Sequence, residues 1–146
     1  MWPATEPVAT FRELALGGGR FRCRAADAAM AAILVAAMVL QVCPGAQALL
    51  AFDRAGIAAG QCWRLATCNL VHFGWGQLLA DAAAMGVLWW LCRRREAPTG
   101  WPVALSLLVV GPAVWAWGGV DVYRGLSGIN CALVASALAD AALRAR

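Results

Sequence analysis

Apolar residues gather into four long runs along this chain, and polar or charged residues end each run. A membrane-spanning helix needs about 20 predominantly apolar residues, so each run is predicted to form one span, the third being short. The predicted fold is all-α, a polytopic membrane helix bundle of one domain. The composition agrees, because 62% of the residues are hydrophobic and only 14% are charged. The predicted spans are residues 28–52, 68–92, 102–117 and 126–143.

The arginines between the runs predict an orientation. Residues 1–27 form a polar leader, which is predicted to be a cytoplasmic tail, because basic residues concentrate on the cytoplasmic side of membrane proteins. Both termini are then cytoplasmic, and topology rather than nucleic-acid binding explains the net charge of +4. The arginines predicted to lie inside are Arg12, Arg20, Arg22, Arg24, Arg93, Arg94, Arg95, Arg144 and Arg146, and those outside are Arg54, Arg64 and Arg124.

A second interpretation treats the start of the chain as a secretory signal. Residues 20–24 would be its basic region, residues 28–42 its apolar region and residues 46–48 its small-residue cleavage site. No secreted globular sequence follows, which favours the first interpretation.

Candidate chemistry centres on one serine. Ser127 lies in the sequence Gly125-Leu126-Ser127-Gly128, where an outer loop enters the fourth run. A serine needs a base to become a nucleophile, and the only histidine of the chain, His72, lies near the outer end of the second run. His72 has two interpretations, a structural one that bonds a loop and a catalytic one. The six cysteines lack Cys-x-x-Cys spacing, so no metal and no cofactor is expected.

Two polar residues interrupt the second run. Gln77 and Asp81 are four residues apart, so they share one stripe of a helix. An ionised Asp81 inside a span costs about 2.5 to 3.5 kcal/mol on insertion scales. Either Asp81 is neutral and bonds a hydroxyl or backbone group of a neighbouring helix, or it lines a hydrated cavity. On the fourth run, Asp140 is expected to pair with Arg144, and a small-residue face is expected to let another helix approach closely, at Gly128, Ala132 and Ser136.

Two blocks of sequence resemble the rhomboid family of intramembrane serine proteases. The first is Trp63-Arg64 followed by His72, Gln77 and Asp81, with Gln77 and Asp81 where the family usually has His and Asn. The second is Gly125-Leu126-Ser127-Gly128, which is similar to the Gly-x-Ser-Gly that opens the serine-bearing fourth helix of rhomboids. Its longer form, Tyr123-Arg124-Gly125-Leu126-Ser127-Gly128, is similar to the bacterial branch called rhombosortases.

The resemblance implies an endopeptidase of the bacterial inner membrane. Ser127 would be the nucleophile, Gly125 and Gly128 the motif glycines, and His72, Gln77 and Asp81 the supporting or oxyanion-stabilising residues. Trp63 and Arg64 would belong to the first outer loop. The implied substrates are exported proteins with one C-terminal membrane span, a small-residue motif and a basic tail, which cleavage would release.

The family's fifth and sixth helices, and the base histidine on the sixth, have no counterpart after residue 143. The chain is therefore expected to be either a truncated protease or an inactive relative. In the inactive alternative, the protein binds transmembrane helices through the polar face of the second run and the small-residue face of the fourth. A further alternative is a four-span cofactor protein in which His72 ligates haem.

Overall fold

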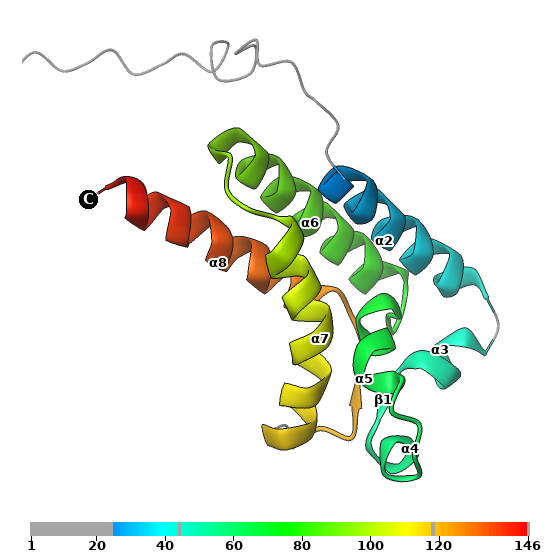
Figure 1. Cartoon of the computed structure of the whole chain (residues 1–146). Coiled ribbons are helices and arrows are strands. Elements are labelled where there is room, and N and C mark those ends of the chain that lie inside the picture. Colours follow the sequence, from blue (N-terminus) through cyan, green and yellow to red (C-terminus); the bar gives the residue numbers. More distant parts are fainter. Residues whose placement is uncertain (1–24, 44, 118, 146) are drawn as a thin grey trace, which may run out of the picture.

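The computed structural model describes residues 25–43, 45–117 and 119–145. Long helices dominate it, and Figure 1 shows them packed as a bundle with the short elements gathered near one end. The prediction of a mostly helical chain is confirmed, with two very short strands that the sequence did not predict. The long helices are α2 (Ala25–Val42), α6 (Trp75–Arg95), α7 (Gly100–Trp117) and α8 (Ser127–Arg144). The short elements are α3 (Ala46–Leu50), β1 (Phe52–Asp53), α4 (Arg54–Ala58), α5 (Arg64–Thr67), the 3-10 turn η1 (Cys68–Leu70) and β2 (Val122–Tyr123).

Two of the helices, α2 and α7, are long and apolar enough to cross a membrane. Only 11% of the α2 window and 22% of the α7 window is buried inside the molecule. Core helices of water-soluble domains bury much more of their apolar surface, so these two helices present theirs to the surroundings. The arrangement of four spans stays a prediction.

The first apolar run is not one helix. Helix α2 ends at Val42, and Gly45 adopts a left-handed conformation with φ of 79° before the short helix α3 begins. Glycine tolerates this conformation, and it turns the chain away from the axis of α2. The run then ends in β1 rather than in a helix. At its other end α2 includes residues 25–27 of the predicted tail, and the rest of that tail, residues 1–24, lies outside the described residues.

The second run also differs from its predicted bounds. Its first residues form η1, and a non-helical stretch that contains His72 separates η1 from α6. Helix α6 starts at Trp75 and extends to Arg95, beyond the predicted end, until Glu96 takes a left-handed conformation with φ of 57°. The other two runs match their helices to within about two residues, and Pro112 lies inside α7.

The core lies mainly between α6 and α8. Side chains seven residues apart on α6 are almost completely buried, and large apolar residues of α8 meet them. This spacing keeps one face of a helix against its partner over several turns. On another side α6 packs against α2 (Figure 1). The core residues of α6 are Leu78, Met85 and Cys92, and those at and near the start of α8 are Leu126, Ile129 and Leu133.

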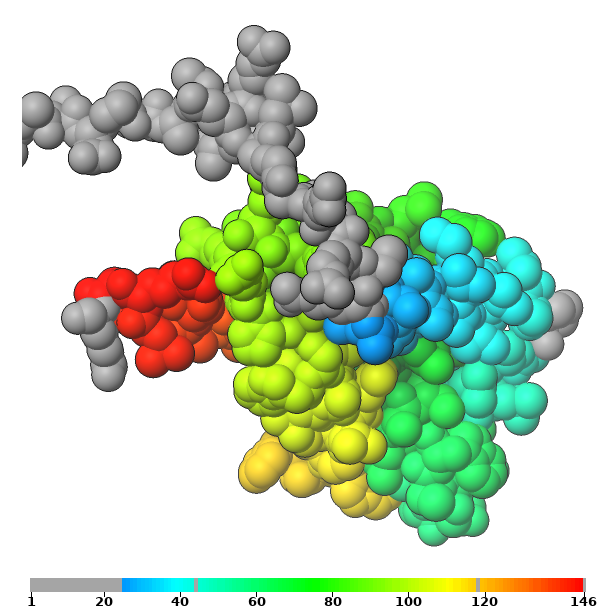
Figure 2. Space-filling model, turned by 45° about the horizontal axis from the view of Figure 1, so that its top comes forward, coloured from blue at the N-terminus to red at the C-terminus, as the bar shows by residue number. Residues whose placement is uncertain are grey.

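Polar contacts bring three helix ends together at one end of the bundle. The Arg93 guanidinium lies 3.4 Å from the Asp27 carboxylate and so joins the end of α6 to the start of α2. Arg144 donates to the Arg95 carbonyl at 2.6 Å and joins the ends of α8 and α6. The predicted pair of Arg144 with Asp140 is confirmed at 2.9 Å. In Figure 2 the last turns of α8, coloured red, project beyond the body of the molecule.

Candidate functional site

The segment before Ser127 is fixed from one side by a two-stranded ladder. Strands β1 and β2 pair antiparallel, with Phe52 opposite Tyr123 and Asp53 opposite Val122. Phe52 is fully buried, and the Arg54 N–H donates to the Asp121 carbonyl at 3.0 Å. The backbone at Tyr123 is therefore anchored to a segment some seventy residues earlier in the sequence.

Two side chains of α6 hold the same segment from the other side. The Gln77 amide donates to the Arg124 carbonyl at 2.9 Å and accepts the Phe73 N–H at 2.9 Å. The Asp81 carboxylate accepts the Leu126 N–H at 3.2 Å. The prediction that Gln77 and Asp81 share one stripe is confirmed by these contacts. The Asp81 carboxylate bonds backbone at the start of a neighbouring helix, which is the contact that the first account of Asp81 predicted.

Gly125 lies between these contacts in a conformation that favours glycine, with φ of +129°. Its N–H donates to the Cys68 carbonyl at 3.1 Å. A Cβ at this position would overlap the Gln77 amide nitrogen and lie 3.0 Å from the Asp81 carboxylate. The loop can approach α6 this closely only because residue 125 has no side chain.

Ser127 is the first residue of α8 and is exposed. Its Oγ lies 2.9 Å from the hydroxyl of Tyr123. This is the only hydrogen bond of the Ser127 side chain within the part of the chain that the structure describes. The Ser127 hydroxyl is therefore open to a partner from outside the molecule.

His72 lies close to the same loop, but its ring faces Asp81, and neither ring nitrogen has a hydrogen-bond partner among the described residues. Its ring is fully buried, and Nε2 lies 3.4 Å from Asp81 Oδ2. Burial lowers the pKa of His72, and the nearby Asp81 carboxylate opposes this effect only in part. His72 is therefore neutral at neutral pH, and no hydrogen bond joins it to Ser127 among the described residues. Its burial also leaves no open face for the haem alternative.

Trp63 and Arg64 stabilise the first loop rather than the serine. The Arg64 guanidinium is buried and donates to the carbonyls of Ala48 at 2.7 Å and Ala51 at 2.9 Å. The Trp63 indole donates to the Leu49 carbonyl at 3.2 Å. These bonds satisfy carbonyl groups at the end of α3 that have no partner within that short helix.

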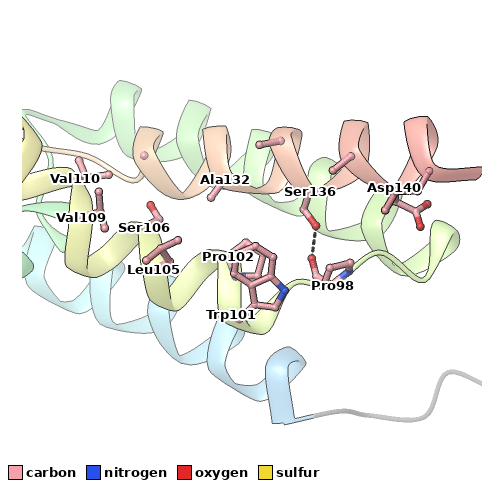
Figure 3. Close-up of a pocket in the computed structure, with 14 residues that line it drawn as sticks. Pro98, Trp101, Pro102, Leu105, Ser106, Val109, Val110, Ala132, Ser136 and Asp140 are labelled. Carbon is pink, nitrogen blue, oxygen red and sulfur yellow. Dashed lines mark hydrogen bonds between the residues drawn. The ribbon is translucent and has the colours of Figure 1, made fainter.

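Gly128 lies where α8 meets α7. A Cβ on Gly128 would lie 2.5 Å from a methyl group of Val110 and 3.3 Å from the Ser106 hydroxyl. From this contact toward the end of α8 the two helices diverge around a groove of about 580 Å³ (Figure 3). Ser136 crosses the groove to donate to the Pro98 carbonyl. The predicted small-residue face therefore allows a close approach at Gly128 and borders an open groove beyond it.

Three polar residues of this region have contacts or burial that the sequence did not predict. Tyr123 contacts the serine, although it belongs to the quoted motif and carried no assigned role. Asn130 donates to the backbone carbonyl of Asp81 at 3.2 Å and helps join α8 to α6. Ser106 is buried in the groove with its hydroxyl pointing toward α8, and it has no hydrogen-bond partner among the described residues (Figure 3). The sequence did offer one signal for Asn130, which is a polar residue one turn after Ser127.

Within the described ranges no three His, Cys, Asp or Glu side chains lie close enough together to hold a metal ion. Comparisons with protein-family models, with curated proteins and with solved structures found no match to this chain.

Proposed function

We propose that this protein is a rhomboid-type intramembrane serine endopeptidase of the rhombosortase-like branch, with Ser127 as its nucleophile. Its substrates would be exported proteins that a C-terminal membrane span anchors. The observation that carries the proposal is the geometry at Ser127: an exposed hydroxyl at the first turn of a long helix, on a loop that both a strand ladder and two α6 side chains hold in place.

The helix arrangement supports a membrane location. Helices α2 and α7 are apolar enough to span a bilayer and bury little of their surface in the molecule. The start of α2 and the ends of α6 and α8 share one end, which carries Arg93 and Arg144. Helices that alternate in direction with their basic ends together are expected of a multi-pass protein that follows the positive-inside rule. We propose four spans, a bacterial inner-membrane location and both termini in the cytoplasm.

The start of α8 supports stabilisation of an oxyanion. The first backbone N–H groups of a helix have no partner within the helix, and the helix dipole adds positive potential there. No side chain caps the start of α8. The N–H group of Ile129 can therefore meet negative charge that develops near Ser127, whereas the Gly128 backbone bonds the Tyr123 phenol. Gln77 and Asp81 act through the loop, because their polar atoms are occupied by its backbone.

The general base is the part of the machinery that the described residues do not provide. His72 is the only histidine in the sequence, and it is buried against Asp81. Hydrolysis through Ser127 therefore requires a base from a group other than His72. Without one, a serine hydroxyl at its ordinary pKa is a weak nucleophile.

The second candidate is a catalytically inactive relative that binds transmembrane helices. The groove between α7 and α8 favours it, because the groove is lined almost entirely by apolar and small residues. Small residues let helix backbones approach closely in a bilayer. In this alternative Ser127 has no chemical role.

A cleavage assay in lipid vesicles separates the two candidates. The purified chain is reconstituted with a single-span substrate that carries a small-residue motif before its span, and the products are measured by mass spectrometry. Cleavage that is lost in Ser127→Ala and kept in Cys131→Ala supports the protease; Cys131 is also exposed and lies one turn further along α8. Absence of cleavage, with the substrate still crosslinked equally to wild type and Ser127→Ala, supports the binding protein.

A further inference from the structure

Tyr123 lies beside the proposed nucleophile without an assigned role. Its hydroxyl is 2.9 Å from Ser127 Oγ, which is within the usual range for a hydrogen bond between two hydroxyl groups. The two residues belong to different elements, because Tyr123 ends β2 and Ser127 begins α8. The contact depends on the turn between them.

That turn is held at almost every residue. Tyr123 pairs with the buried Phe52, the Arg124 carbonyl accepts from Gln77, and the Gly125 N–H donates to the Cys68 carbonyl. The Leu126 N–H donates to Asp81. With the backbone fixed on both sides, the Tyr123 hydroxyl and Ser127 Oγ meet without further rearrangement.

The protonation state of the phenol defines what it can do. Burial raises the pKa of Tyr123 above its ordinary value, and the hydrogen bonds with the Ser127 hydroxyl and with the Gly128 backbone lower it in part. The other titratable groups that act on it, Cys68 and Asp81, both raise the pKa. The phenol is therefore protonated at neutral pH, so it cannot serve as a general base, and it has a proton to donate.

We propose that Tyr123 is a positioning residue for Ser127, whose phenol donates a hydrogen bond to Ser127 Oγ. This inference rests on the proposed endopeptidase function. The bond occupies one lone pair of Oγ and restricts the serine side chain to one orientation. The hydroxyl proton of Ser127 then points away from the phenol, and Tyr123 keeps its own proton throughout.

A direct test uses the absorbance of the tyrosine itself. Tyr123 is the only tyrosine in the sequence, and the tryptophans have no ionisation that competes, so the tyrosinate band in the near ultraviolet reports this one residue. When the phenol ionises, Ser127 turns to donate to the phenolate, and a hydrogen bond to a charged acceptor is stronger than a neutral one. The midpoint is therefore expected to move to higher pH in Ser127→Ala and to stay unchanged in Ser136→Ala.

A second measurement tests the catalytic consequence. Tyr123→Phe keeps the ring and removes only the hydroxyl. In the vesicle assay it is expected to lower kcat about tenfold with KM unchanged, as expected for the loss of one hydrogen bond that matters at the transition state. Thermal unfolding of Tyr123→Phe is measured alongside, because a merely structural role would lower the melting temperature and leave kcat of the folded fraction unchanged.

Each result of the titration and of the cleavage assay either supports or contradicts the positioning role of Tyr123. An unchanged midpoint in Ser127→Ala, or an unchanged kcat in Tyr123→Phe, would overturn it. If the wild type cleaves nothing, the endopeptidase function has failed, and the titration still reports whether the phenol holds Ser127. A shifted midpoint together with a lower kcat supports the positioning role.

Discussion

The two faces of α8 differ in how completely they are covered. The face toward α6 is closed by large apolar side chains, among them Leu133 and Ile129, and by the bond from Asn130 to the Asp81 carbonyl. The face toward α7 touches closely at Gly128 and then borders a groove in which the Ser106 hydroxyl has no partner among the described residues. The contacts with α6 therefore set the position of helix α8, and with it the position of Ser127, its first residue.

The largest expected effect is a loss of stability when a core side chain between α6 and α8 is shortened, compared with the same change in the groove between α7 and α8. Leu78 is fully buried between α6 and α8, so Leu78→Ala is expected to lower the free energy of unfolding by about 2 to 5 kcal/mol. The matched control is Leu105→Ala, a residue that lines the groove and is half exposed, with an expected loss of about 0.5 kcal/mol or less. Denaturant unfolding in detergent micelles measures both. Equal losses would show that the two faces are packed equally well.

A smaller loss of stability is expected when alanine replaces the glycine at either end of the sequence Gly125-Leu126-Ser127-Gly128. Gly125→Ala forces a left-handed conformation and overlaps the Gln77 amide, so it is expected to cost about 1 to 3 kcal/mol. Gly128→Ala meets the side chains of Val110 and Ser106 but no backbone, and is expected to cost about 1 kcal/mol. The melting temperatures of the two variants show which substitution destabilises the protein more. A Gly128→Ala variant that is less stable than Gly125→Ala would contradict the account of the loop.

The smallest expected effect is a dependence of stability on pH. The folded protein favours neutral His72, because burial lowers its pKa, whereas in the unfolded chain histidine takes up a proton near pH 6.5. Stability is therefore complete above about pH 6.5 and falls as the pH decreases through that value toward the folded pKa. His72→Gln, which leaves the chain without histidine, is expected to remove this component. A pH profile that is identical in both proteins would place His72 in contact with solvent.

Several features could be predicted from residue spacing. Repeating apolar runs and their charged ends predicted the long helices, and the four-residue separations predicted the Arg144–Asp140 pair and the shared stripe of Gln77 and Asp81. These predictions succeeded because they depend on the geometry of a single helix, which is the same in every protein.

Predictions that crossed from one element to another were weaker. The second run was predicted to be one span over residues 68–92, although the chain is not helical at His72. Hydrophobicity does not distinguish a helix from an apolar loop that is buried by its neighbours. The contact of Tyr123 with Ser127 depends on the pairing of β2 with a strand that is distant in the sequence, so no local pattern indicated it.

The order of residues established the apolar helices, the basic ends and a serine at the start of α8, because each follows from local periodicity or charge. Only the tertiary structure established that His72 is buried against Asp81, that two α6 side chains hold the serine loop, and that a tyrosine contacts the serine. Those relations depend on which helix faces meet, and that is set by the packing of side chains from distant segments.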